Sequence, residues 1–203
     1  MTAPAAETYI PFVPGRPSPS RPNGWWGMLL LILTEASLFA VTIAAYFYIR
    51  FKTVSWPPDG LPDPKVVTPL LLTLLLVTTS APVYLAERAI RRGEQRTCRL
   101  GLLAVTVISL VYAILQFLEL RSDWSSLPAT RDTYASLYFT LTGAHLAHVA
   151  AGVLLAAWVT MRAFAGAYAS DRNAAVQVTA LYWHFVNVLA AVIFVVVYLS
   201  PVL

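Results

Sequence analysis

Charged residues are scarce in this chain of 203 residues: Lys, Arg, Asp and Glu together make up 12% of it. An average soluble domain has about 25% charged residues and about 45–50% apolar ones. Here the hydrophobic share is 58%. A soluble fold of this length could not bury so much apolar surface. The composition therefore predicts an integral membrane protein.

Cysteine is almost absent as well. Cys98 is the single one, so the chain can form no internal disulfide and contains no zinc knuckle. The net charge of +4 is no sign of nucleic-acid binding, because the charged residues lie between apolar runs, as they do where loops meet lipid headgroups. We therefore expect membrane lipids and membrane proteins as partners, and no nucleic acid.

Five apolar runs are each long enough to cross about 30 Å of hydrocarbon at about 1.5 Å per residue. The runs are continuous, which favours helices over the short alternating strands of a barrel. Pro82 is expected to bend the end of the second run. We predict an all-α integral membrane protein, a bundle of five transmembrane helices. The expected spans are Trp25–Tyr48, Val66–Ala86, Leu100–Leu118, Tyr134–Met161 and Val178–Leu199.

The first 24 residues hold six of the fourteen prolines, which disfavour both helix and sheet. We therefore expect residues 1–24 to be an extramembrane tail and residues 25–203 to be the five-helix transmembrane domain. Nine Lys and Arg residues fall on the side of the tail and of the loops between spans 2 and 3 and between spans 4 and 5, and five fall on the other side. Because positive charges favour the inner side, this bias predicts N-inside and C-outside.

Ionisable residues inside a span are costly, so they are candidates for function. Glu35 lies ten residues into the first span, about 15 Å along the helix, on a face shared with Phe39, Thr42 and Tyr46. A carboxyl group at that depth favours its protonated form. Two compatible roles follow, a neutral carboxyl bonded to a neighbouring helix and a group that handles protons.

The third span carries Ser109, Tyr112, Gln116 and Glu119 at spacings of three, four and three residues. This spacing places them on one stripe of a helix. On an otherwise apolar helix, such a stripe is expected to face other protein and to bond neighbouring helices.

All three histidines lie in the last two spans, His145 and His148 in the fourth and His184 in the fifth. Imidazole is a common metal ligand, so a metal or haem site is one reading. The spacing fits it poorly, since zinc-protease helices place two histidines four residues apart with a catalytic Glu between them. The ligand set is incomplete, and packed, hydrogen-bonded histidines are the favoured interpretation.

These segments resemble the subunit III family of haem-copper respiratory oxidases. The string YWHFV at residues 182–186 is similar to the most specific motif of that family, and TGAHLAHV at residues 142–149 is similar to its TG-x-H-x-x-HV pattern. Gln116 with Glu119, and Glu35 in the first span, match its Gln/Glu pair and its buried acid. The order of the motifs agrees over about residues 24–200.

The resemblance implies the short, five-helix form of an accessory subunit with no haem or copper of its own, the redox centres lying in partner subunits. Such a subunit packs against subunit I, binds phospholipid and supports proton uptake in a proton-pumping oxidase of the cytochrome c oxidase type. A multi-pass protein of the bacterial inner membrane is expected. The resemblance implies that Glu35 takes the place of the buried acid and that Glu119, His148 and His184 belong to the internal polar network of the family.

Position 187 departs from the family, which commonly has Asp three residues after the histidine of YWHF, whereas this chain has Asn187. An amide cannot ionise, so a proton-carrying role at that position is in doubt. The members attached to quinol oxidases or nitric-oxide reductases share the pattern and remain alternatives. Other classes are an independent proton-coupled transporter, which the lack of an inverted repeat disfavours, and a metal-dependent membrane enzyme.

Overall fold

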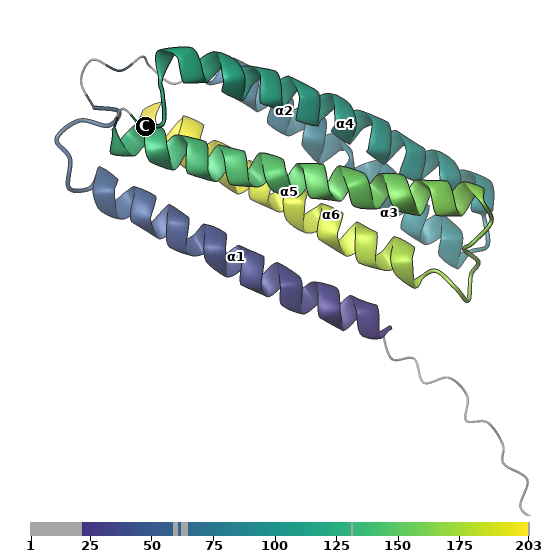
Figure 1. Ribbon diagram of the computed structural model, residues 1–203. Coiled ribbons are helices and arrows are strands. Elements are labelled where there is room, and N and C mark those ends of the chain that lie inside the picture. The colour runs from purple at the N-terminus through teal and green to yellow at the C-terminus, as the bar shows by residue number, and fades with distance from the viewer. Residues whose placement is uncertain (1–21, 59–60, 62–64, 131, 203) are drawn as a thin grey trace, which may run out of the picture.

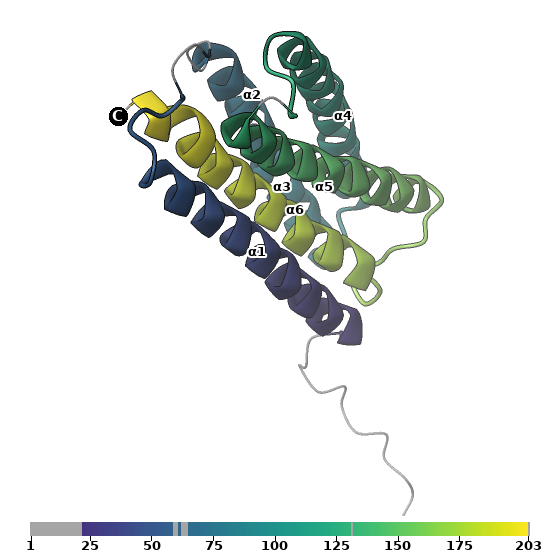
Figure 2. The ribbon, with the colours of Figure 1, turned by 60° about the vertical axis from the view of Figure 1, so that its left-hand side comes forward.

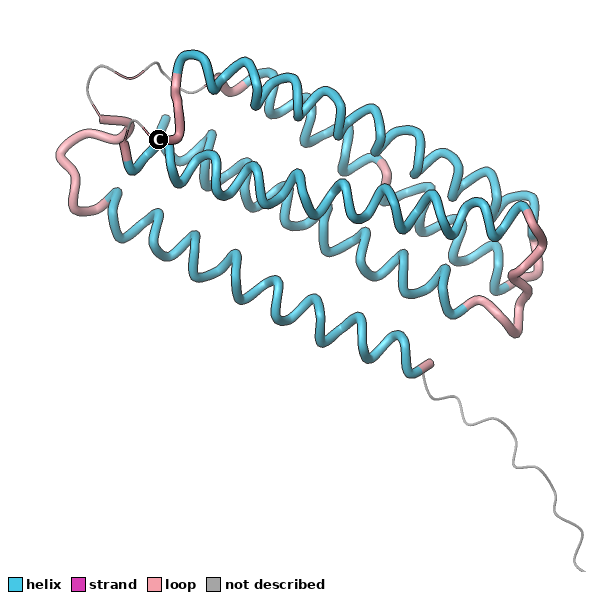
Figure 3. Tube along the Cα trace, in the orientation of Figure 1, coloured by secondary structure: helices cyan, strands magenta, loops and turns pink. Residues whose placement is uncertain are grey.

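A computed structural model of the chain describes residues 22–58, 61, 65–130 and 132–202. Within these segments the chain consists of helices joined by loops, with no β-strand (Figure 3). A π-helix (Phe194–Leu199) and a 3₁₀ turn (Ser200–Val202) continue the last α-helix. The α-helices are α1 (Asn23–Arg50), α2 (Val67–Thr78), α3 (Ser80–Arg91), α4 (Gln95–Ser126), α5 (Thr133–Phe164) and α6 (Ala174–Ile193).

The prediction of five membrane-spanning helices is confirmed. Helices α2 and α3 together form one span, Val67–Arg91, and α6 with the π-helix forms another, Ala174–Leu199. Most of the expected tail lies outside the described residues, and α1 begins at Asn23, two residues before the expected Trp25.

The expected bounds were too short for α4. This helix runs from Gln95 to Ser126, 32 residues or about 48 Å, whereas the prediction ran from Leu100 to Leu118. Hydropathy marks where apolar side chains stop, but the backbone hydrogen bonds continue through polar residues beyond that point. Both ends of α4 therefore extend past the apolar layer, which is about 30 Å thick.

Helices α5 and α6 lie at the centre of the bundle. Helix α5 packs against α4, α6 and α1, and α6 also contacts α2 and α3. Helix α1 lies at the edge, beside α6 and α5 (Figures 1 and 2). Only Phe39 and Tyr46 of α1 are fully buried, while Leu30 and Val41 on its other side are mostly exposed. Most of its apolar surface is thus left for lipid or another protein.

The second span is interrupted at Thr79, three residues before Pro82 (Figure 3), whereas the prediction was a bend by Pro82 at the end of the span. Proline lacks the N–H that would bond the carbonyl four residues before it, here that of Thr78. The chain tightens at this point, and the Thr79 N–H bonds to Leu76 O at 3.0 Å. The break leaves the Thr79 side chain fully buried between α2 and α3.

Trp183 of α6 fills the space beside this break. Its side chain is fully buried, and its Nε1 donates to Thr79 Oγ1 at 2.7 Å. Its ring also lies against the backbone of α5, where a Cβ added to Gly152 would fall 2.4 Å from Trp183 Cζ3. One indole ring therefore sets the positions of α2, α3 and α5 around α6.

Replacing Gly152 with Ala is expected to destabilise the bundle, because the new methyl group would force the Trp183 ring away from its place. Overpacking of this kind costs about 1–3 kcal/mol. Thermal unfolding in detergent, followed by near-ultraviolet circular dichroism, measures the effect.

Gly143→Ala is the matched control on the same helix, because a Cβ there has nothing within 4 Å. This control should gain about 0.5–1 kcal/mol, the usual helix preference for Ala over Gly. Equal melting temperatures for the two variants would show that the Trp183 contact carries no weight.

Candidate functional site: polar groups between the helices

Glu35 of α1 and His148 of α5 form a hydrogen-bonded pair across the seam between their helices. Glu35 Oε2 lies 3.0 Å from His148 Nε2, and His148 Nδ1 lies 2.7 Å from the carbonyl oxygen of Ala144. Because a carbonyl oxygen only accepts, Nδ1 carries a proton and donates to it. The bond between Glu35 and Nε2 then needs one further proton, which sits either on the carboxyl or on the imidazole.

The Glu35–His148 pair therefore has two forms that keep its hydrogen bond, a neutral acid beside a neutral imidazole and a carboxylate beside an imidazolium. Loss of that proton would leave a carboxylate facing a ring lone pair. The two side chains are 30% and 19% exposed, so the pair is open on one side. The ring of Phe39 meets the His148 ring edge-on at 5.2 Å, and the Tyr182 hydroxyl donates to His148 O.

Asn187 belongs to a second group, at the break between α2 and α3. Its Nδ2 donates to Thr79 Oγ1 at 3.1 Å and to Ser80 Oγ at 2.7 Å. Thr79 gives its own hydroxyl proton to Leu76 O, so its oxygen can only accept from Asn187 and Trp183. The amide therefore has a donor role in helix packing that an ionised Asp could not take.

A third group surrounds His145, which is 4% exposed. The Tyr112 hydroxyl donates to Gln116 Oε1 at 3.3 Å, and the Tyr112 ring meets the His145 ring edge-on at 6.4 Å. Ser109, Tyr112 and Gln116 are all buried, as expected for a stripe that faces protein. Glu119, the last member of that stripe, is half-buried, and its carboxyl group has no hydrogen bond among the described residues.

Asp123, which the sequence analysis missed, is better connected than Glu119. The Tyr138 hydroxyl donates to Asp123 Oδ2 at 2.6 Å, and Lys65 Nζ lies 3.1 Å from Asp123 Oδ1. Asp123 continues the stripe of α4 at the next four-residue step after Glu119. The signal was therefore present, but the expected span ended at Leu118.

The histidines do not converge. His148 pairs with Glu35, His145 faces α4, and the half-buried His184 ring has no hydrogen bond among the described residues. In residues 22–58, 61, 65–130 and 132–202, no group of three or more His, Cys, Asp or Glu side chains is placed to hold a metal ion. The geometry thus brings Glu35 and His148 together but leaves His184 apart from both.

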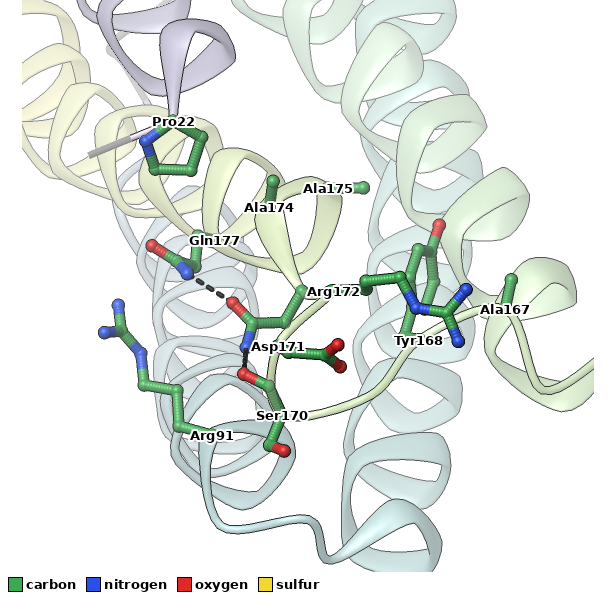
Figure 4. A pocket seen from close by; sticks show the side chains of 11 residues that line it. Pro22, Arg91, Ala167, Tyr168, Ser170, Asp171, Arg172, Ala174, Ala175 and Gln177 are labelled. Carbon is green, nitrogen blue, oxygen red and sulfur yellow. Dashed lines mark hydrogen bonds between the residues drawn. The ribbon is translucent and has the colours of Figure 1, made fainter. Parts of the chain in front are cut away.

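A surface pocket of about 720 Å³ lies at the end of the bundle where α3 ends and α6 begins. Arg91 and Arg172 line it from different sides, and Asp171 and Gln177 also border it (Figure 4). Hydrogen bonds from Gln177 to Asn173 and from Asn173 to Ser170 hold the loop before α6. None of the residues singled out from the sequence lines this pocket.

Comparison with known proteins shows which family this chain matches. The family model described as cytochrome c oxidase subunit III matches residues 21–201. The chain is 29% identical over 175 residues to cytochrome c oxidase subunit 3 of a Synechocystis strain, covering 86% of this chain and 74% of that protein.

Two further relatives carry the same protein name. Cytochrome c oxidase subunit 3 of Thermostichus vulcanus is 27% identical over 174 residues, or 85% of each protein. The wheat (Triticum aestivum) protein of the same name is 31% identical over 180 residues, covering 85% of this chain and 67% of that protein. The match spans all five membrane helices, and the chain belongs to the cytochrome c oxidase subunit III family of the haem-copper oxidases.

Proposed function

We propose that this chain is an accessory subunit of a proton-pumping haem-copper oxidase of aerobic respiration, and that its Glu35–His148 pair supports proton uptake. The contact of 3.0 Å between Glu35 Oε2 and His148 Nε2, in a member of the subunit III family, carries the proposal. Haem and copper belong to the partner subunits. Subunit I is the direct partner, and the bacterial inner membrane is the location.

The chemistry of the pair supports this role. A proton can move between Glu35 Oε2 and His148 Nε2 without breaking their hydrogen bond, so the pair stores a proton at little cost in structure. Its open side, at the seam of the edge helix α1 with α5, gives that proton a route to a neighbouring subunit. A fully enclosed pair would hold its proton but could not exchange it.

Glu35→Gln in the assembled oxidase is expected to keep the fold, because an amide can still donate to His148 Nε2. Proton uptake should slow, or the number of turnovers before inactivation should fall, because the amide releases no proton. Glu35→Ala should also destabilise the bundle by roughly 0.6 kcal/mol, the average for such bonds between membrane helices. Oxygen consumption and proton release in vesicles measure the first effect.

Glu94→Gln is the matched control, since Glu94 is exposed beside the start of α4 and far along the chain from the pair. The complex is purified in mild detergent through a tag on this chain, and recovery without haem- and copper-containing subunits would contradict the assembly. If the Glu35 variants turn over and pump like the parent through many cycles, the pair is structural only.

The orientation we propose is N-inside and C-outside. The support is the placement of nine Lys and Arg residues on the side of the N-terminus against five on the other, since positive charge favours the inner side. Five of the nine lie in and beside the turn between α3 and α4: Arg88, Arg91, Arg92, Arg96 and Arg99. That turn therefore dominates the preference.

Single cysteines at Ser18 and Leu203, in a Cys98→Ser background, should react with an impermeant thiol reagent from opposite sides of the membrane. Thr53→Cys, in the loop after α1, is the internal control and should behave like Leu203→Cys. Labelling of Ser18→Cys and Leu203→Cys from one side would contradict an odd number of spans. Labelling of Ser18→Cys from the outside alone would contradict the proposed orientation and indicate the opposite one.

We also propose that the pocket between α3 and α6 binds the headgroup of an anionic phospholipid. Arg91 ends the second span and Ala174 begins the fifth, so the pocket lies at the depth of lipid headgroups. Two arginines against Asp171 leave it with a net positive charge. Helix α6 begins without a side-chain cap among the described residues, and the first N–H groups of a helix have no partner within the helix, so they can bond phosphate.

Arg172→Gln should lower the amount of anionic phospholipid that stays with the purified complex, because it removes one of the two cationic groups of the pocket. Native mass spectrometry or lipid extraction measures this. Arg88→Gln is the control, since Arg88 is exposed on α3 and does not line the pocket. Equal amounts of bound anionic phospholipid in the two variants would contradict the proposal that this pocket binds a lipid headgroup.

A further inference from the structure

A small cavity lies inside the bundle beside His145, between α2, α4, α5 and α6. It offers about 20 Å³ to the centre of a water-sized sphere, and a single water molecule needs about 10–15 Å³ by that measure. Part of its wall is apolar, from Pro69, Ala190 and Ile193. Its polar wall consists of Thr73, Tyr112, Gln116, Thr142, His145 and Tyr198.

The His145 ring is the polar group in this wall that most needs a partner. Both of its nitrogens are buried, and neither has a hydrogen-bond partner among the described residues. A buried polar group left unpaired costs about 1–3 kcal/mol, so such groups almost always have a partner, often an ordered water. The cavity is therefore both large enough and polar enough for water to stay in it.

A chain of hydrogen bonds leads from the cavity to the surface. The hydroxyl oxygens of Tyr198 and Tyr138 are 3.1 Å apart, Tyr138 donates to Asp123 Oδ2 at 2.6 Å, and Asp123 Oδ1 pairs with Lys65 Nζ at 3.1 Å. The Lys65 side chain is 63% exposed. We call Tyr198, Tyr138 and Asp123 the tyrosine chain.

The direction of these bonds follows from the number of protons. Tyr138 has one hydroxyl proton and gives it to Asp123, so its oxygen accepts from Tyr198. Tyr198 has then used its own proton, and its oxygen can only accept from a group in the cavity. Every donor in the tyrosine chain therefore points toward the Asp123 carboxylate, and the open acceptor lies at the cavity end.

We propose that the cavity is a binding site for one ordered water molecule, which bonds to His145 and donates to Tyr198, and that the tyrosine chain exchanges protons between His145 and the surface near Lys65. This site shares no residue with the Glu35–His148 pair, and the proposal does not depend on the proposed function. It assigns His145 a role apart from that of His148, one helical turn away.

Each transfer balances. A proton passes from the His145 imidazolium to the water, one passes from the water to Tyr198, one from Tyr198 to Tyr138, and one from Tyr138 to Asp123. The water and both hydroxyls keep their number of protons while the direction of their hydrogen bonds reverses, His145 ends neutral, and Asp123 ends as the acid. The reverse order reloads His145 from the surface.

The full chain, labelled with ¹⁵N-histidine and placed in lipid bilayers, suits solid-state NMR because it has only three imidazoles. A correlation between the His145 ring nitrogens and a bound water proton is expected, with His145→Leu identifying the signal. Transfer to deuterated water should exchange the His145 ring proton, and both Tyr198→Phe and Tyr138→Phe should slow that exchange about tenfold or more.

Tyr182→Phe is the matched control, because Tyr182 lies in α6, which the π-helix of Tyr198 continues, and its hydroxyl bonds to a backbone carbonyl outside the tyrosine chain. In this variant the His145 ring proton should exchange at the rate of the parent. If a tyrosine variant fails to fold, Asp123→Asn interrupts the same chain at its outer end and should slow exchange likewise. No bound water at His145 in the parent would overturn the binding site. Unchanged exchange in the variants that fold would overturn the tyrosine chain.

Discussion

The hydrogen bond from Trp183 to Thr79 is the contact on which the arrangement of the bundle depends. Pro82 breaks the second span, the break turns the Thr79 hydroxyl inward, and the indole N–H of α6 meets it at 2.7 Å. The same ring lies against Gly152, which fixes the depth of α5 beside α6. Helix α5 in turn directs His148 toward α1 and His145 toward α4. Both polar centres therefore depend on a contact in which neither histidine takes part.

The Thr79 hydroxyl uses all of its hydrogen-bonding capacity. Thr79 Oγ1 donates once, to Leu76 O, and accepts twice, from Trp183 and Asn187, so its capacity is full. Such complete pairing has value in a membrane, where lipid offers no substitute partner. Asn187 Oδ1, by contrast, is buried without a partner among the described residues. Compared with an ionised Asp at position 187, Asn187 thus gains two hydrogen bonds that it donates to hydroxyls, and its Oδ1 acceptor stays unused.

Much of the fold could be predicted from the sequence because its signals are local. The lengths of the apolar runs gave five spans, and Pro82 predicted a bend near the end of the second, although the break itself lies at Thr79. The stripe through Ser109, Tyr112 and Gln116 pointed inward, as helical spacing requires. Pairings between helices could not be predicted, because they depend on packing across distant segments.

Glu35 and His148 show the limit of this reasoning, since 113 positions separate them and no local pattern joins them. The sequence marked each as a polar residue at membrane depth, and the family resemblance placed His148 and His184 alike in the polar network, but nothing favoured His148 over His184 as the partner of Glu35. Asp123 shows a different limit. It lay beyond the apolar run, and only the full length of α4 reveals that it is still helical and still on the inner stripe.

The π-helix at residues Phe194–Leu199 has a consequence for how relatives are aligned. A π-turn amounts to one residue inserted into an α-helix, and one residue of α-helix turns the chain by about 100°. A relative with one residue fewer here could keep every other position of α6 in register and still direct the counterpart of Tyr198 away from Tyr138. A single-residue gap near the C-terminus, easily dismissed as noise, would then mark the loss of a buried polar contact between α5 and the end of the last span.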